Sequence, residues 1–456
     1  MSKGTKLLKN TGIFAFGSLG SKVISFLMVP LYTYTLSTAD YGKVDLVLTT
    51  VNLFLPIVSL SLFDAAFRFV MDDENDNAEI LKTALVSIAA LSLIFLPVVL
   101  SVGHMMSIDS LYWFWAILSL SAVFNLMQNY IRAMGYSKLF SVNGMINTLI
   151  FALLNLIFLL LLKWGLNGYF LSYVLSLSVT VAIPMVAIDA RRILNTSKYS
   201  VALLKKMMRY SLPLIPNSLS WWLTNDVSRY FILVFVGVTG NGLFAVANKI
   251  PAIVSIIFNV IVQAWQISVI EELGSDDAGS FFSDVIDRLV IVSFTIQTLL
   301  LLSIKIIFPL IVSPDYQSAW EYVPLMMLAV TMSNLSAFLG AVYVATKKTS
   351  ALFVTTIVGT AINVTLALGL TRCWGINGTA VAAVVAFFAV FFLRLNHIQK
   401  FINLNVNTAM LITYTLLYLM AAVLLINMWW WAAVATSVVL LSVLGYSFVY
   451  KNKFKK

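Results

Sequence analysis

The chain has 456 residues, of which 61% are apolar and 11% are charged. Soluble domains average about 45–50% apolar and about 25% charged residues, so this composition excludes a soluble enzyme. A membrane-spanning helix needs about 20 mostly apolar residues, and the apolar total suffices for about fourteen crossings. One cysteine, Cys373, and two histidines offer neither a disulfide framework nor a zinc cluster, and we expect no cofactor.

The first half of the chain contains six apolar stretches separated by short polar connectors. They lie at Asn10–Leu36, Val44–Val70, Thr83–His104, Leu111–Met134, Phe140–Leu162 and Leu166–Ile188. The connector that follows them is longer and carries six basic residues: Arg191, Arg192, Lys198, Lys205, Lys206 and Arg209.

The second half begins with six further stretches and ends with two more. The six lie at Ser211–Val238, Leu243–Ile270, Val285–Ile311, Tyr322–Ala345, Ala351–Thr371 and Ile376–Leu395, and the last two at Val406–Ile426 and Trp429–Tyr450. The sequence thus predicts an all-α integral membrane protein of about fourteen transmembrane helices. We divide it into an N-lobe (1–190), a basic connector (191–210), a C-lobe (211–400) and helices 13 and 14 with a basic tail (401–456).

The basic residues gather on one side of this arrangement. If the N-terminus is cytoplasmic, 20 of the 29 Lys and Arg residues fall on the cytoplasmic side and three, Lys43, Lys163 and Arg372, on the other. The positive-inside rule then places both termini in the cytoplasm. Because orientation accounts for most of the net charge of +10, nucleic acid is not needed as a partner.

A short motif occurs once in each half of the chain. Residues 164–168 read WGLNG and residues 374–378 read WGING, and each copy precedes an apolar span. Tyr41-Gly42 and Asn241-Gly242 also occupy equivalent turns. Six crossings separate the copies, so the motif predicts two six-helix lobes in a parallel pseudo-repeat, with substrate bound near mid-membrane where the lobes meet.

Several charged residues fall inside the predicted spans, where they usually face a bundle interior or a water-filled cavity. The spacing of Asp64 and Arg68, and of Asp226 and Arg229, also allows pairing along one helix face. Lys22 and Lys249 have no acid three or four residues away. The predicted cavity cations are Lys22, Arg68, Arg229 and Lys249, and the acids that could bind a coupling Na⁺ or H⁺ are Asp45, Asp64 and Asp226.

Polar and aromatic side chains also line single faces of the first, second, seventh and eighth spans. Interhelical hydrogen bonds are one explanation of these faces. A sugar ligand is another, because hydroxyl groups need hydrogen-bond partners and the rings of sugars stack on aromatic residues. The candidate sugar-binding residues are Asn52, Trp221, Trp222, Asn225, Asn248, Asn259, Gln263 and Gln266.

Two segments near the N-terminus carry a family resemblance. Residues 30–42 read PLYTYTLSTADYG and residues 63–69 read FDAAFRF, which resembles the polysaccharide transporter family. This family includes the O-antigen and capsule repeat-unit flippases. It belongs to the superfamily of multidrug extruders and the lipid II flippase.

The resemblance implies a bacterial inner-membrane flippase with two lobes around a central cavity. It implies outward movement of undecaprenyl-pyrophosphate-linked oligosaccharides by alternating access, with cations of the first, second, seventh and eighth helices meeting the pyrophosphate. The partners would be this lipid, the bilayer and other polysaccharide-assembly proteins. A cation-coupled drug extruder is the main alternative, and a membrane polysaccharide polymerase or ligase, which would be an enzyme, is a more distant one.

Overall fold

The computed structural model describes residues 20–72, 76–106, 111–272, 275, 277–346 and 348–453, except for some side chains, which include those of Asn259 and Gln263. Every regular element in these residues is a helix. Eleven of the helical stretches are long and apolar enough to cross a membrane, and one of them, Ser350–Ile398, joins two predicted spans. The protein is an all-α integral membrane protein, and the predicted layout of about fourteen crossings agrees with this arrangement.

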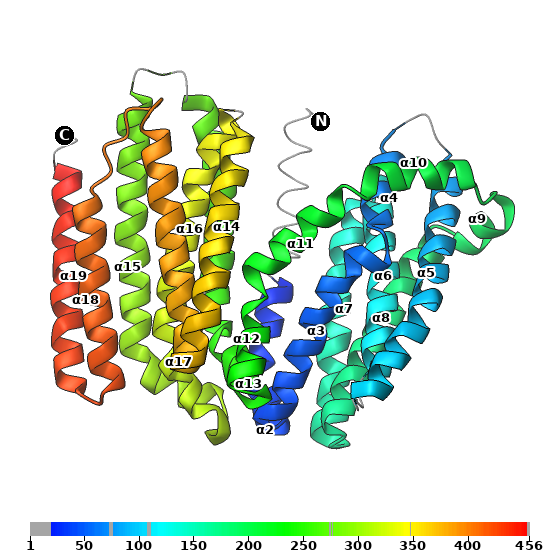
Figure 1. Cartoon of the computed structure of the whole chain (residues 1–456), viewed down its shortest axis with the longest axis horizontal. Coiled ribbons are helices and arrows are strands. Elements are labelled where there is room, and N and C mark those ends of the chain that lie inside the picture. The colour runs from blue at the N-terminus through cyan, green and yellow to red at the C-terminus, as the bar shows by residue number, and fades with distance from the viewer. Residues whose placement is uncertain are drawn as a thin grey trace. The chain divides into compact units, whose positions relative to one another are not determined.

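The chain divides into two compact units, Met1–Asp226 (unit 1) and Val227–Lys456 (unit 2) (Figure 1). The helices of unit 1 after residue 27 are α2 (Val29–Thr35), α3 (Thr38–Val58), α4 (Leu62–Val70), α5 (Asn77–Met106), α6 (Leu111–Ala133), α7 (Ser137–Asn155), the π-helix η1 (Leu156–Leu161), α8 (Gly165–Ala187), α9 (Ala190–Thr196), α10 (Val201–Ser211) and α11 (Leu214–Asn225).

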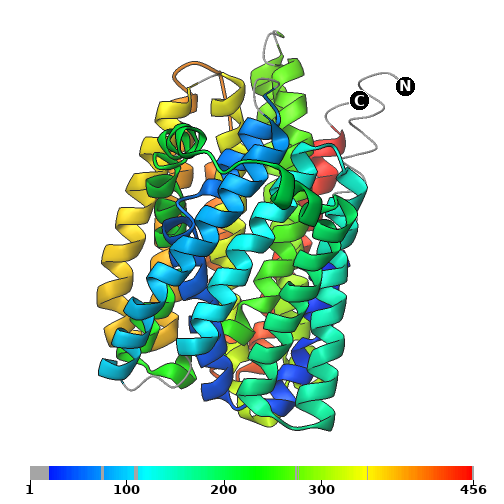
Figure 2. The same ribbon diagram turned by 90° about the vertical axis from the view of Figure 1, so that its right-hand side faces the viewer.

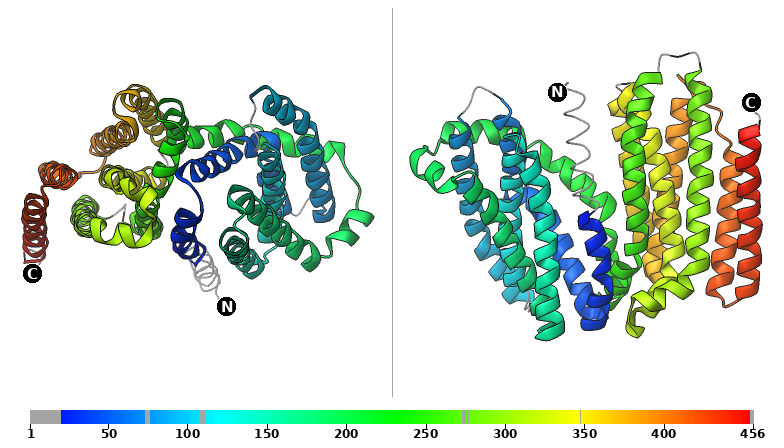
Figure 3. Two further views of the ribbon diagram at one scale, coloured as in Figure 1. Left: turned by 90° about the horizontal axis from the view of Figure 1, so that it is seen from below. Right: turned by 180° about the vertical axis from the view of Figure 1, so that it is seen from behind.

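Unit 2 also consists of helices, and its last two helices are the pair that the sequence predicts after the twelfth span. They are α12 (Ser228–Phe235), α13 (Val238–Ala247), α14 (Lys249–Glu272), α15 (Ala278–Ile311), the 3₁₀-helix η2 (Pro314–Tyr322), α16 (Val323–Ala345), α17 (Thr349–Ile398), α18 (Thr408–Ile426) and α19 (Trp430–Lys453). The last two lie side by side, and α19 also packs along α15 (Figures 1 and 3).

The core of unit 1 lies where α4, α5 and α6 meet. Leu62, Ala65 and Ala66 of α4 are fully buried against these two helices. α5, α6 and α8 run alongside one another behind this contact (Figure 2). Small alanines on α4 let the helix backbones approach closely, which favours helix association in a membrane.

The centre of unit 2 is α16. Of the 18 most apolar consecutive residues in the Pro314–Ala345 stretch, 78% are buried. In each of the other ten stretches that could cross a membrane, the buried share is 50% or less. α16 packs on α14, α15 and α17. It is therefore apolar around its whole circumference, as expected for a helix enclosed by other helices.

In both copies of the repeated motif the first glycine has a positive φ angle. Gly165 has φ +53° and Gly375 has φ +58°, positive values that residues other than glycine rarely adopt. The second glycine of each motif packs closely: a Cβ on Gly168 would lie 3.2 Å from the carbonyl oxygen of Phe158, and one on Gly378 would collide with the carbonyl of Leu370. The pseudo-repeat is thus visible in the backbone.

Candidate substrate-binding site

The four spans that carry the predicted cations are all interrupted. A turn at Met28 precedes α2, and Leu60 and Ser61 separate α3 from α4. Asp226 and Val227 separate α11 from α12, and Asn248 lies between α13 and α14. Such breaks free backbone polar groups, which are tolerated at membrane depth only inside protein or beside water. Broken helices mark binding sites in many transporters.

Unit 1 contains two of the predicted cations. Lys22 is exposed and forms no ion pair with the residues that the structure describes. Arg68 is also exposed, but its Nη1 lies 3.3 Å from Oδ2 of Asp72, one turn further along the chain. The sequence suggested Asp64 as the partner of Arg68; the arginine turns the other way, toward the end of α4, where a cation also interacts favourably with the helix dipole.

Unit 2 contains the other two cations, both half-buried and both next to a break. Arg229 lies in the first turn of α12, with its guanidinium carbon 5.6 Å from the ring centre of Phe244. Its carbonyl accepts a hydrogen bond of 3.0 Å from Nδ2 of Asn241. Lys249 is the first residue of α14. Arg229 and Lys249 thus lie at helix interruptions, whereas Lys22 and Arg68 lie in interrupted spans but at least six residues from the break.

The predicted sugar-binding residues differ in accessibility. Asn52, Asn225 and Gln266 are exposed, Asn248 is half-buried, and the side chains of Asn259 and Gln263 lie outside the described part. Trp221 is 60% exposed, whereas Trp222 is buried and its Nε1 donates to the carbonyl of Thr49 at 2.9 Å. This bond joins α11 to α3 and leaves Trp221 as the accessible ring of the pair.

The three candidate coupling acids are half-buried. Asp64 lies in the first turn of α4, and Asp226 ends α11. Asp45 of α3 is close enough to Tyr41 and Tyr169 to interact electrostatically with both phenols.

A buried aromatic cluster adjoins Asp45, and the sequence did not reveal it. Tyr32 lies 6.0 Å from Tyr41 and 5.3 Å from Tyr169, measured between ring centres. Asn155 donates to the Tyr32 hydroxyl at 3.4 Å, and its own Oδ1 is buried without a hydrogen-bond partner among the described residues. Asn155 also marks the point where α7 becomes the π-helix η1, a conformation that often accompanies functional sites.

Arg394 is a second feature that sequence reasoning missed. The charge pattern places it on the cytoplasmic side of the membrane, and the structure shows that its side chain is only 6% exposed, within α17. Its guanidinium donates to the Ser336 carbonyl at 2.6 Å, to the Thr355 hydroxyl at 3.1 Å and to the Thr356 hydroxyl at 3.0 Å. It thereby joins α16 to both halves of α17. The sequence pattern did not reveal this role, because the hydrogen-bond partners of Arg394 are far from it along the chain.

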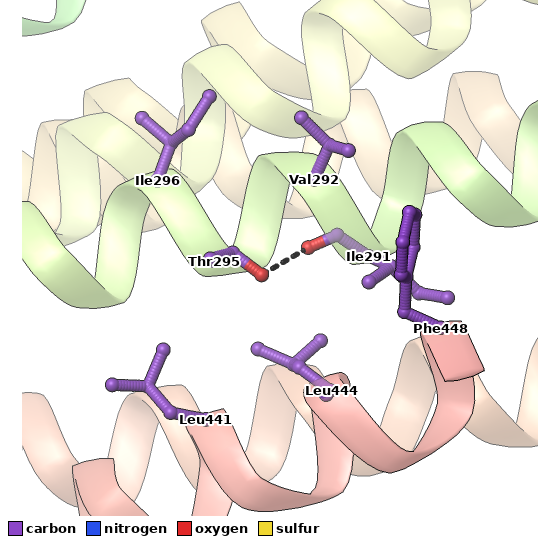
Figure 4. Close-up of a pocket in the computed structure, with 8 residues that line it drawn as sticks. Ile291, Val292, Thr295, Ile296, Leu441, Leu444 and Phe448 are labelled. Atoms are coloured by element: carbon purple, nitrogen blue, oxygen red, sulfur yellow. Dashed lines mark hydrogen bonds between the residues drawn. The ribbon is translucent and has the colours of Figure 1, made fainter.

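An apolar pocket of about 330 Å³ lies between α15 and α19 in unit 2 (Figure 4). Its lining includes Val292, Ile296 and Leu444, and its one hydroxyl, on Thr295, donates to the Ile291 carbonyl. The pocket suits a hydrocarbon chain and not a sugar or a pyrophosphate, because it offers no free hydrogen-bonding group. Among the described residues, no group of His, Cys, Asp and Glu could hold a metal ion.

A sequence profile described as "polysaccharide biosynthesis protein" matches residues 7–266, more than half of the chain. The chain belongs to this family. No curated protein sequence matches it.

Solved structures with the same fold are transporters. The lipid II flippase MurJ, in an inward closed conformation, has a TM-score of 0.67 over 98% of this chain and 100% of its own, at 10% identity. An inward-facing multidrug resistance transporter of the MATE family scores 0.63 over 83% of this chain and 95% of its own, at 15% identity. A MOP superfamily transporter from Pyrococcus furiosus scores 0.55 over 86% and 95%, at 14% identity. This family member thus has a flippase and exporter fold.

Proposed function

We propose that the protein is a flippase that moves undecaprenyl-pyrophosphate-linked oligosaccharide repeat units from the cytoplasmic to the outer leaflet of the bacterial inner membrane. The units would serve O-antigen, capsule or exopolysaccharide synthesis. The observation that carries the proposal is the family match over residues 7–266. Within polysaccharide biosynthesis, the step that a transporter fold serves is the movement of a lipid-linked intermediate across the membrane.

The cations of the interrupted spans support this choice over a drug extruder. Lys22 and Arg68 in unit 1 and Arg229 and Lys249 in unit 2 suit an anionic pyrophosphate, because a cation within a membrane span lowers the cost of bringing in a negative charge. An extruder of cationic drugs would need acids in excess. The exposed Trp221 and the polar residues Asn52, Asn225 and Asn248 suit sugar rings and hydroxyls.

The mechanism that we propose is alternating access without covalent chemistry, so the protein would not be an enzyme. The sugar-pyrophosphate head enters from the cytoplasm while the polyprenyl tail stays in the bilayer. The membrane potential favours outward movement of an anion by about 2.3 kcal/mol per charge per 100 mV. Asp45, Asp64 and Asp226 are the acids through which Na⁺ or H⁺ would couple, and the termini would be cytoplasmic.

Reconstitution into vesicles tests the proposal. A fluorescent polyprenyl-pyrophosphate sugar is added to one leaflet, and protection from an external hydrolase is measured for the wild type, Lys22→Gln and the control Arg372→Gln, which removes an exposed charge in unit 2. We expect the wild type and the control to translocate alike, and Lys22→Gln to be at least about tenfold slower, since one lost charge interaction of about 1.4 kcal/mol is a factor of ten.

Two outcomes would contradict this assignment. Equal rates in all three proteins would remove Lys22 from the binding site. A wild type that fails to move the sugar lipid but exports a cationic dye would instead support the multidrug extruder, whose fold is also similar.

A further inference from the structure

The basic connector between α8 and α11 folds into two helices, α9 and α10, although the sequence predicted only a charged link. α10 lies across one end of the helices of unit 1 (Figures 1 and 2). It packs against α4 and α5, with Leu203 and Met207 buried in the same core as Leu62 and Ala66.

Polar contacts fix the position of this segment. Lys82 Nζ donates to the Ser197 carbonyl at 2.8 Å, and the Ser200 amide donates to the Thr83 hydroxyl at 3.2 Å. The Tyr199 hydroxyl lies 3.3 Å from Oγ of Ser87. These contacts and the buried Leu203 and Met207 together fix the orientation of α10, so one side of this helix always faces outward.

The outward side carries a set of cations that we call the basic surface: Arg191, Arg192, Lys198, Lys205, Lys206 and Arg209, all exposed. Among the residues that the structure describes, none of the six forms an ion pair. Lys205 and Arg209 are one turn apart on α10, a like-charge spacing that destabilises a helix by a few tenths of a kcal/mol. An anion bound between them would remove this repulsion.

Apolar side chains flank the cations on the same outward side. Val201 is 57% exposed and Leu212 42%. α9 begins three residues after α8 ends, and α11 begins three residues after α10 ends, so the basic surface stays close to the ends of two predicted spans. Cations flanked by exposed apolar groups at a span end are typical of a helix that lies in a lipid interface.

We propose that the basic surface binds the headgroups of anionic phospholipids. A soluble phosphate would need the cations but not the exposed Val201 and Leu212, whereas a phospholipid offers its phosphate to the cations and its acyl chains to these apolar groups. The proposal does not depend on which substrate the protein transports. It gives the connector a role beyond setting orientation, since the bound headgroups hold α10, and through its core contacts α4, at the membrane surface.

Lipid-selective fluorescence quenching tests this proposal. The only natural cysteine is removed by Cys373→Ser, and Val201→Cys carries a bimane fluorophore next to the basic surface. The protein is placed in phosphatidylcholine nanodiscs with a fixed fraction of brominated phosphatidylglycerol or of brominated phosphatidylcholine. We expect the anionic lipid to quench with an apparent association constant at least about fivefold higher at low salt, and the preference to fall sharply in 1 M NaCl, where the Debye length is about 3 Å.

Two charge variants locate the effect. The triple variant K205Q/K206Q/R209Q should quench equally with both lipids. The control K43Q/K163Q/R372Q, which removes the same number of exposed charges from positions outside the basic surface, should keep the preference. Because the triple variant could fail to fold, its elution in size-exclusion chromatography is compared with the wild type, and the single variant R209Q should show an intermediate preference.

Three results would overturn the proposal. The first is equal quenching by both lipids in the otherwise wild-type labelled protein. The second is a full preference in a correctly folded triple variant. The third is loss of the preference in 10 mM inorganic phosphate at constant ionic strength, which would show that the cations recognise a free phosphate ion and not a lipid.

Discussion

Arg394 illustrates how one residue can connect three helical segments. Its guanidinium reaches Ser336 on α16 and Thr355 and Thr356 on the first half of α17. The planar, forked donor geometry of arginine suits acceptors that lie in different directions. Nearby, His397 lies 3.1 Å from the hydroxyl of Tyr343, which itself donates to the Arg394 carbonyl, so a continuous polar network closes this end of unit 2.

We predict that Arg394→Lys destabilises the protein more than Arg394→Met does. Lysine keeps a buried charge but cannot reach all three acceptors, which costs about 3 kcal/mol of unfolding free energy. Methionine removes the charge and leaves the Ser336 carbonyl without its donor, at about 1 kcal/mol. Thermal unfolding in detergent measures the order, and the exposed Arg372→Lys is the control. The reverse order of Lys and Met would show that a charged donor at position 394 stabilises the protein more than its incomplete pairing costs.

At the scale of single residues, the sequence predicted which charged residues lie within spans better than it predicted their interaction partners. It marked Lys22 as a cation with no acid three or four residues away, and among the described residues Lys22 forms no ion pair. It did not reveal that Arg394 is buried or that Arg68 pairs with Asp72 and not with Asp64, because side-chain direction and contacts between distant segments are set by packing, which a one-dimensional pattern does not contain.

At the scale of elements, the most unusual feature is the break between α3 and α4. Leu60 and Ser61 both have left-handed φ angles, +49° and +47°, and neither is glycine. The Ser61 amide donates to the carbonyl of Pro56, and Asn129 donates to the carbonyl of Phe63. The first bond pairs groups that the interrupted helix leaves open, and the second joins the start of α4 to α6, while Ser61 Oγ is buried without a partner in the described structure.

Ser61→Gly should therefore stabilise the protein. A left-handed residue with a side chain costs about 1–2 kcal/mol, and a buried hydroxyl without a partner costs about 1–3 kcal/mol. The extra backbone entropy of glycine cancels about 0.5–1 kcal/mol of this gain, so we expect a net gain of at least about 1 kcal/mol in thermal unfolding. The control Ser59→Gly should lose stability, because Ser59 has a negative φ and donates to the Leu55 carbonyl at 2.6 Å. If Ser61→Gly melts lower than the wild type, the left-handed turn does not store strain.

Hydropathy found the spans but not their internal breaks or their ends. The second span was predicted from Val44, whereas α3 begins at Thr38, because the Ser37 hydroxyl accepts a hydrogen bond from the Asp40 amide and caps a polar first turn. Likewise, the span 140–162 divides into α7 and η1. Apolar length measures the hydrocarbon that a segment crosses, whereas caps, prolines and left-handed residues decide where the helix starts, bends and stops.

For the whole molecule, the orientation predicted from charge can be tested with the single cysteine. Cys373 is exposed, next to the turn at Gly375. We predict that a membrane-impermeant maleimide labels it in intact cells. In a Cys373→Ser background, Lys198→Cys on the basic surface should react only after permeabilisation, since the charge pattern predicts that the two positions lie on opposite sides of the membrane. Labelling of Lys198→Cys in intact cells would contradict the predicted orientation and indicate the opposite one.

The whole-molecule layout was the most predictable level. An all-α membrane protein with about fourteen spans follows from composition and span number, and the exporter fold follows from the family resemblance of residues 30–42 and 63–69. The apolar pocket between α15 and α19 and the tyrosine cluster around Asp45 did not follow, because each depends on helices that are neighbours only after folding.

The paired glycine turns at 165–168 and 375–378 have an evolutionary consequence. An even number of crossings separates them, so a gene for one half could be copied end to end without inverting the second copy in the membrane. The ancestor of such a chain would then have worked as two identical subunits inserted in the same direction. At Gly168 and Gly378, which keep the same place in both halves, a larger residue would crowd a backbone carbonyl.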